Sequence, residues 1–331
     1  MKRIGLIVAL VGLVLAVAAG AAPVKIGICQ IVEHPALDAV RQGVIDALKD
    51  AGYSEGVNVE YLIANAQGDP NNAVPIAQNF RAAGVNLVVA ISTPMALAAA
   101  EVFRGSSVPI VFSAVTDPVA SGLVLSATDP SQNGNVTGVS DLIDVASDLA
   151  ILKEIGASRI GIVYNPGEAN SDRLTDLALA AAGPLGVKIV EAVADSSANV
   201  PLAAQSLLGR VDAIYVTTDN TVVSALGAVI AVALEGKLPF LVADPTSLEA
   251  GATLATGFDY YRHGILSGGV VLQVLQGKAP SQIPVTYQTG SQIYLSLDAA
   301  AKIGFVFPKG LVSRAAVILY GGVRWERVGA E

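Results

Sequence analysis

Cysteine, histidine and aromatic residues are scarce in this sequence. Its 331 residues include one cysteine, two histidines and one tryptophan, and aromatic residues make up 5% of the chain. Because Cys29 is alone, no disulfide can form within the chain, and stability must come from the burial of apolar side chains. Imidazole and thiolate groups are also too few for a transition-metal site. We therefore expect neither a metal nor a cofactor.

Charge is low as well, and basic residues are fewer than acidic ones. The chain has 20 Lys and Arg against 28 Asp and Glu, a net charge of −8. A negative surface repels phosphate backbones, so nucleic acid is excluded as a partner.

Motifs of catalysis are missing too. The sequence contains no G-x-S-x-G, H-E-x-x-H, C-x-x-C, G-x-G-x-x-G or P-loop motif. A hydrolase that uses Ser92 or Ser113 with His34 is conceivable, because all three residues lie at strand ends of one half, but no spacing requires it. We predict that the protein is not an enzyme.

Apolar residues, by contrast, make up 53% of the chain, and their first long run lies at its start. Lys2 and Arg3 precede the apolar stretch from Ile4 to Ala19, and small residues follow it, which is the order of a secretory signal. The alternative is an uncleaved membrane anchor, but a spanning helix needs about 20 apolar residues. We predict a signal peptide over residues 1–22 and a periplasmic or otherwise extracytoplasmic mature protein.

Strand-like and helix-like segments alternate through the rest of the chain. Four such pairs in a row predict a parallel sheet with helices on its faces, and a second series of four predicts a second sheet. The fold class is therefore α/β, with two doubly wound, Rossmann-like lobes. The expected strands are 24–30, 57–64, 86–92 and 108–115, the last followed by a helix-like segment at 116–124, and then 159–166, 187–194, 212–218 and 238–244.

The segments between and after the two series predict where the chain passes from lobe to lobe. Residues 129–141 are rich in Asn, Gly and Ser and form the first expected crossing. The tail after the second series is too short for a third domain, but it can cross the hinge twice more. We predict an N-terminal lobe of residues 23–140 plus 258–287 and a C-terminal lobe of residues 141–257 plus 288–331.

Polar side chains follow nearly every predicted strand. In open parallel sheets, ligands bind beyond the carboxyl ends of the strands. Each residue taken singly also fits an ordinary helix N-cap, often with proline after it, but together with nearby aromatic residues they predict a polar pocket with apolar walls. His263 lies within an expected helix without polar neighbours and is assigned to the structure. The candidate ligand-binding residues are Glu33, His34, Ser92, Thr93, Thr116, Asp117, Asn165, Glu168, Asn170, Asp219, Asn220, Phe258 and Tyr260.

Six ordered segments carry a family resemblance: ICQIVEHPALDAVRQGV, STPMALAAA, IVFSAVTDPVASGLV, GNVTGVSD, YNPGEANS and VDAIYVTTDNTV. The sequence resembles the substrate-binding proteins of one family of ABC transporters, in the branch linked to uptake of the aromatic amino acids tryptophan, phenylalanine and tyrosine. The resemblance covers residues 24–315. It implies the type I periplasmic-binding-protein fold, with three hinge strands and a ligand closed between two lobes, and an ABC transporter permease as partner. The tail ILYGGVRWERVGAE matches no motif of the family.

The resemblance implies an aromatic or large apolar amino acid as ligand, with a sugar or another polar solute as the alternative. An amino acid needs donors for its carboxylate and an acceptor for its ammonium group. Ser92, Thr93 and the N–H groups that open the following helix suit the carboxylate. Asp219 is the first choice for the ammonium group, with Asp117 and Glu33 as alternates.

The expected export signal leads to a first prediction. The mature N-terminus should fall between Gly20 and Val24, because the small residues that suit signal peptidase lie there. N-terminal sequencing of the protein from the extracytoplasmic fraction checks this. Recovery of a membrane-bound chain that keeps Met1 would contradict it.

Overall fold

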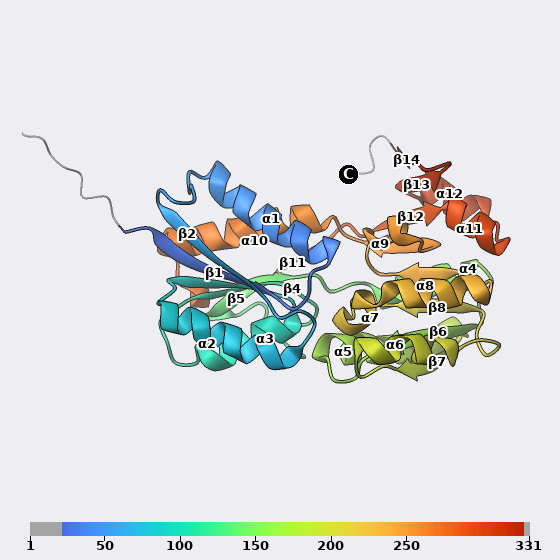
Figure 1. The fold of residues 1–331 in the computed structure, drawn as a ribbon, viewed down its shortest axis with the longest axis horizontal. Coiled ribbons are helices and arrows are strands. Elements are labelled where there is room, and N and C mark those ends of the chain that lie inside the picture. The colour runs from blue at the N-terminus through green and yellow to red at the C-terminus, as the bar shows by residue number, and fades with distance from the viewer. Residues whose placement is uncertain (1–21, 328–331) are drawn as a thin grey trace, which may run out of the picture.

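Two sheets of mostly parallel strands organise the chain, each at the centre of one lobe (Figure 1). The structure is a computed structural model and describes residues 22–327. The predicted α/β fold class is confirmed. The predicted signal peptide lies outside the described residues except for Ala22. Within residues 22–327, no helix has the length and apolar character needed to cross a bilayer.

The first sheet has six strands, all parallel, in the order β11-β5-β4-β3-β1-β2. Strands β3, β4 and β5 are buried along their whole length, as continuous apolar runs in parallel sheets are when helices cover both faces. The strands are β1 (Val24–Gln30), β2 (Val59–Asn65), β3 (Leu87–Ile91), β4 (Ile110–Val115), β5 (Val136–Ser140) and β11 (Thr286–Tyr287), and the helices are α1 (Pro35–Asp50), α2 (Ala73–Ala83), α3 (Thr93–Val102) and α10 (Tyr260–Leu275).

The second sheet has eight strands in the order β14-β13-β12-β10-β9-β8-β6-β7. Two pairs, β10 with β12 and β13 with β14, are antiparallel. The strands are β6 (Arg159–Tyr164), β7 (Lys188–Val193), β8 (Ala213–Val216), β9 (Phe240–Val242), β10 (Leu254–Gly257), β12 (Gln292–Ser296), β13 (Val317–Tyr320) and β14 (Val323–Glu326). The helices are α4 (Val145–Glu154), α5 (Ala169–Leu185), α6 (Val200–Gln205), α7 (Asn220–Ser224), α8 (Leu226–Glu235), α9 (Ser247–Ala250), α11 (Leu297–Ile303) and α12 (Lys309–Arg314).

One expected helix is absent from the described chain. Residues 116–124, after β4, form turns instead. Gly122 adopts a φ of 73°, which ends any helical path. The side chain of Asp117 accepts the N–H of Ala120 at 3.0 Å and so closes a local turn.

The chain passes between the two sheets three times, after β5, after β10 and after β11. Helix α10 therefore packs in the first lobe, against α1 and β4, although it follows the strands of the second (Figure 1). On these passages we propose lobe boundaries at residues 140/141, 257/258 and 287/288.

Helices α1 and α10 cross at two glycines. A Cβ on Gly264 would lie 2.9 Å from the Cα of Gly43 and closer still to the carbonyl oxygen of Val40. These distances are too short for any side chain, so both positions require glycine. The close approach attaches α10 to the first lobe, and α10 begins with Tyr260.

We therefore predict opposite effects for two substitutions within α10. Gly264→Ala should lower the free energy of unfolding by about 1–3 kcal/mol, because the added methyl group forces the helices apart. Gly269→Ala, the control, has open space around the new Cβ and should raise it by roughly 0.5–1 kcal/mol. Denaturant unfolding of both variants measures the difference. Equal effects would contradict the close crossing.

Candidate functional site

A cavity lies between the lobes, where the carboxyl ends of both sets of strands face each other. Six of the predicted residues line it: His34, Thr93, Thr116, Asn170, Asn220 and Tyr260. The sequence-based candidates omitted three other polar residues of the lining, Asp141, Thr218 and Asp244. Apolar wall comes from Ala36, Leu37, Ala114 and Val223.

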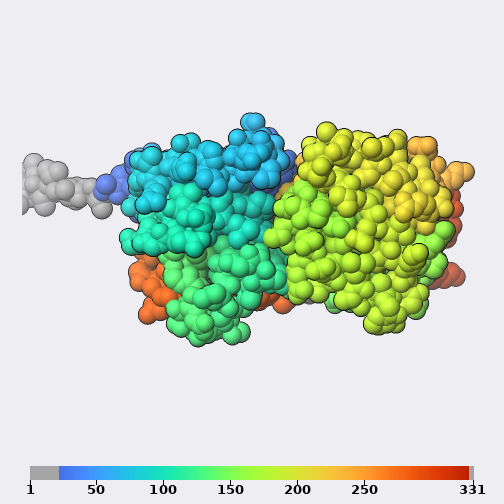
Figure 2. All heavy atoms as spheres, turned by 90° about the horizontal axis from the view of Figure 1, so that it is seen from below, coloured from blue at the N-terminus to red at the C-terminus, as the bar shows by residue number. Residues whose placement is uncertain are grey.

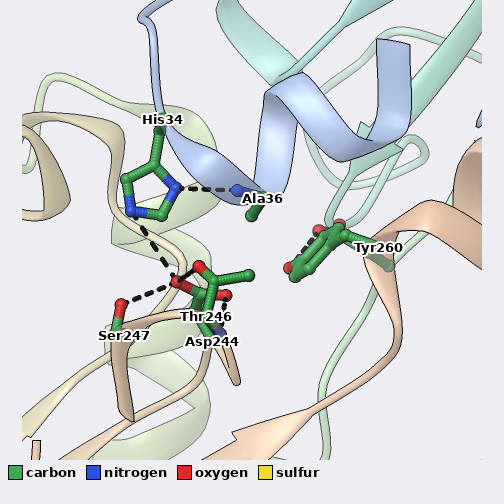
Figure 3. Close-up of polar contacts among 7 residues, drawn as sticks. His34, Ala36, Asp244, Thr246, Ser247 and Tyr260 are labelled. Atoms are coloured by element: carbon green, nitrogen blue, oxygen red, sulfur yellow. Dashed lines mark hydrogen bonds and ion pairs between the residues drawn. The ribbon is translucent and has the colours of Figure 1, made fainter. Parts of the chain in front are cut away.

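His34 and Asp244 face each other from opposite lobes (Figure 3). The Nδ1 atom of His34 accepts the N–H of Ala36 at 3.3 Å and so caps α1. Its Nε2 atom lies 3.7 Å from the Oδ2 atom of Asp244. That same Oδ2 accepts the hydroxyls of Thr246 and Ser247, each at 2.7 Å. The carboxylate of Asp244 is thus held by its own loop and contacts the other lobe through His34.

Asp141 is the buried carboxylate of the cavity that retains a free acceptor. It follows β5 and is 3% exposed. Its Oδ2 atom accepts the hydroxyl of Tyr260 at 3.1 Å, whereas its Oδ1 atom has no hydrogen-bond partner among residues 22–327. Burial raises the pKa of Asp141 to about 6. A buried acceptor without a partner costs about 1–3 kcal/mol, which a donor on a ligand would recover.

Thr93 and Asn170 bring further free polar atoms to the lining. The Thr93 hydroxyl and the Asn170 Oδ1 are buried and unpartnered within the described chain. Thr93 opens α3, whose first-turn N–H groups lack partners within the helix. The preceding Ser92 has a φ of 90°, a strained conformation for a residue other than glycine and one of a kind that clusters at functional sites. These features give the start of α3 the chemistry to hold an anionic group.

His263 supports the cavity wall from behind. Its Nε2 atom accepts the N–H of Ala114 at 2.9 Å, and Ala114 lines the cavity with a φ of 51° at an irregular point of β4. Burial lowers the pKa of His263 to about 4, so the ring is neutral and can accept this bond. His263 is structural, as expected, but it does have a polar partner.

The position of Asp219 corrects the choice of ammonium partner. Asp219 caps α7 and is fully buried outside the cavity lining. Its Oδ2 atom accepts the N–H of Asn165 at 2.6 Å and the Ser171 hydroxyl at 2.5 Å, and its Oδ1 atom accepts the N–H of Val222 at 2.8 Å. Burial, and after it the charge of Glu168, raise the pKa of Asp219 to about 7. Its acceptors join segments of one lobe and leave none for a ligand.

The other two ammonium candidates also lie outside the lining. Glu33 is exposed at the end of β1. Asp117 forms an ion pair with Arg173 of α5 across the lobes, with 3.0 Å between its Oδ2 atom and the Arg173 Nε. Together with the Thr116 and Thr218 hydroxyl oxygens, 3.4 Å apart, this pair joins the rims of the lobes, which meet along the face in Figure 2.

Four more candidates lie outside the cavity wall, and two of them, Glu168 and Asn165, have structural partners. Glu168 accepts the N–H and hydroxyl of Thr221 at 2.8 and 2.6 Å, and the amide of Asn165 donates to the same hydroxyl at 2.9 Å. Ser92 lies buried before α3, and its hydroxyl has no hydrogen-bond partner in the described chain. Phe258, at the boundary between the lobes, packs against the core of the second lobe. The N-cap signal that selected the polar residues marks helix starts whether or not they reach the cavity.

Known proteins resemble this chain in both sequence and structure. The family model for ABC transporter substrate-binding proteins matches residues 25–318. A tyrosine-binding protein of Clostridioides difficile is 38% identical over 83% of this chain and 79% of its own length. A conserved domain protein from Vibrio cholerae is 41% identical over 89% of this chain and 99% of its own, with a TM-score of 0.86.

Two further solved structures differ in ligand state. One, from Streptococcus pneumonia in complex with L-Trp, is 27% identical over 90% of this chain and all of its own, with a TM-score of 0.85. The other is the ligand-free, open structure of a substrate-binding protein with adhesive properties from Clostridium difficile. It is 37% identical over 86% of this chain and 96% of its own, with a TM-score of 0.65.

The buried carboxylates lead to a prediction about pH. Burial raises the pKa values of Asp141 to about 6 and of Asp148 and Asp219 to about 7, whereas in the unfolded chain they are about 3.9. Between these values the folded protein binds more protons than the unfolded one, so stability rises as the pH falls. His263 opposes the trend, because its lowered pKa makes the unfolded chain the better proton acceptor below about pH 6.5.

Three carboxyls raise the stability as the pH falls, and one imidazole lowers it. The Tm of the ligand-free protein should therefore be at least about 3 °C higher at pH 5 than at pH 8, the shift that roughly 1 kcal/mol produces. Asp148→Asn should reduce this rise, and exposed Asp50→Asn should leave it unchanged. A Tm that falls steadily over this range in the wild type would contradict the assignment.

Proposed function

The chain belongs to the family of ABC transporter substrate-binding proteins, and from this membership we propose that it captures an aromatic amino acid between its lobes and delivers it to an ABC importer. Proteins of this family are receptors, so the prediction that the chain is not an enzyme is confirmed, and the hydrolase alternative falls. We further propose an extracytoplasmic location, where such a receptor meets its ligand.

The free Oδ1 atom of Asp141 is the observation that carries the proposal. This buried oxygen belongs to a residue of the cavity lining and has no hydrogen-bond partner among the described residues. An α-ammonium group would supply both the missing donor and the opposite charge. We therefore replace Asp219 with Asp141 as the proposed ammonium partner. The pairing would stabilise the ionised carboxylate and lower the pKa of Asp141 in the complex.

The carboxylate and side chain of the ligand have complementary surroundings. The hydroxyl of Thr93 and the first N–H groups of α3 offer donors and the positive end of a helix dipole to the α-carboxylate. Leu37, Val223 and Tyr260 supply apolar surface for a ring. The tyrosine-binding relative and the L-Trp complex support an aromatic side chain over a sugar.

The lobes are arranged as expected for a ligand-bound receptor. The structure is more similar to the L-Trp complex than to the ligand-free open structure, although the open protein has the higher sequence identity. Contacts that cross between the lobes include those of His34 with Asp244, Asp117 with Arg173, Thr116 with Thr218 and Tyr260 with Asp141. A ligand that touches both lobes would favour this state through its higher affinity for it.

Calorimetric titration with L-Tyr, L-Trp and L-Phe tests the proposal. Asp141→Asn should weaken binding at least about thirtyfold, the lower end of the roughly 2–5 kcal/mol lost when a buried ion pair loses one partner, and should leave the Tm near or above that of the wild type. Asp219→Asn is the matched control. It should lower stability by about 0.5–2 kcal/mol as a lost cap and affect affinity less.

A ligand without the ammonium group separates the charge effect from packing. Deamino-tyrosine should bind the wild type at least tenfold more weakly than L-Tyr, whereas Asp141→Asn should discriminate little between the two. If the wild type binds none of the three amino acids, the proposed ligand class is wrong. If it binds them and Asp141→Asn binds equally well, the class stands and the assignment of Asp141 fails.

A further inference from the structure

The C-terminal hairpin leaves one edge of the second sheet uncovered by any other described strand. Strand β14 pairs with β13 alone and is exposed at all four positions. It lies at the upper edge of its lobe in the view of Figure 1, beyond residue 318, where the match to the family model ends.

The register of the hairpin determines which backbone groups point outward. The N–H of Arg327 donates to the carbonyl of Ala316 at 2.8 Å, and Trp325 lies opposite Ile318. Because hydrogen-bonded and non-bonded positions alternate along an antiparallel ladder, residues 323, 325 and 327 direct their N–H and C=O groups toward β13. Arg324 and Glu326 direct theirs to the free edge.

The side chains of β14 divide in the same alternating way. Trp325, the single tryptophan of the chain, is 61% exposed and lies on the same face as Val323 and, across the hairpin, Tyr320, which are 51% and 62% exposed. Arg324 and Glu326 share the opposite face, with 2.8 Å between the Arg324 Nε and the Glu326 Oε1. The apolar side chains of β14 thus lie on one face, and the other face carries opposite charges two residues apart.

We propose that β14 is a self-association site, at which it pairs antiparallel with β14 of a second copy of this chain. In a symmetric antiparallel pair the two-fold axis passes beside one residue, which then faces its own copy. An axis at Arg324 or at Glu326 would bring two like charges together. An axis at Trp325 places each Arg324 opposite Glu326 of the other copy.

The Trp325 register also satisfies the backbone. Arg324 and Glu326 are the residues with outward N–H and C=O groups, so they form hydrogen-bonded pairs across the interface. The two Trp325 side chains then meet at a non-hydrogen-bonded position, where cross-strand neighbours are nearest. Charged residues on an edge strand ordinarily discourage pairing, but this order of charges is complementary to itself.

The interface is small, and the association should be weak. Stable complexes bury about 1,200–2,000 Å², more than a four-residue strand with three exposed apolar side chains can supply. The proposal therefore predicts a concentration-dependent dimer. Residues of β14 are absent from the cavity lining, so ligand binding should not depend on it.

Sedimentation equilibrium of the mature protein, with and without charge reversal, tests the proposal. The wild type should show a monomer–dimer equilibrium with a dissociation constant below about 1 mM, the weak end of measurable affinity. R324E and E326R should each weaken it at least tenfold, because each places like charges opposite one another. The double variant R324E/E326R should restore it, since the pairs re-form with signs exchanged.

R104E is the matched control, because it reverses one member of an exposed Arg–Glu pair far from the hairpin, and it should associate like the wild type. Thermal melts and amino acid titration of every variant show whether folding and binding are intact. A wild type that stays monomeric to about 1 mM, single variants that associate normally, or a double variant that does not recover would each overturn the proposal.

Discussion

The parallel arrangement of the strands is the constraint on which the rest of the structure depends. Parallel strands deliver all their carboxyl ends to one edge of a sheet, and each end must turn into a helix or loop there. Those turns are rich in Asp, Asn, Ser and Thr because such residues satisfy the open N–H groups of helix starts. When two such edges face each other, they enclose a cavity with polar groups from both lobes.

The acidic residues at this edge have different roles because they have different partners. The carboxylates of Asp219 and Glu168 receive donors from their own lobe and hold its loops together. Asp244 is held in the same way and reaches His34 across the cavity. Asp141 keeps one buried oxygen without a described partner. The free acceptor, more than the charge itself, makes Asp141 the candidate for ligand contact.

Support for the cavity comes from a segment far along the chain. Helix α10 returns to the first lobe, and its close crossing with α1 at Gly43 and Gly264 positions it there. From this place Tyr260 reaches Asp141, and His263 holds the N–H of Ala114. The walls of the cavity therefore depend on packing between segments more than 100 residues apart.

The sequence by itself determined the fold class, the alternation of strands and helices, and the family. Apolar periodicity and the polar strand ends are local properties, and they sufficed to select His34, Thr93 and Tyr260 among the lining residues. The sequence could not show which acidic residue is free to contact a ligand, because Asp117, Asp219 and Asp244 all follow strands and begin turns in the same local pattern. Asp141 is the last residue of the segment that the sequence predicts to cross between the lobes, and nothing in that segment indicates that its side chain is buried. Only the tertiary structure decided which carboxylate oxygens were occupied, because their donors come from segments brought together by folding.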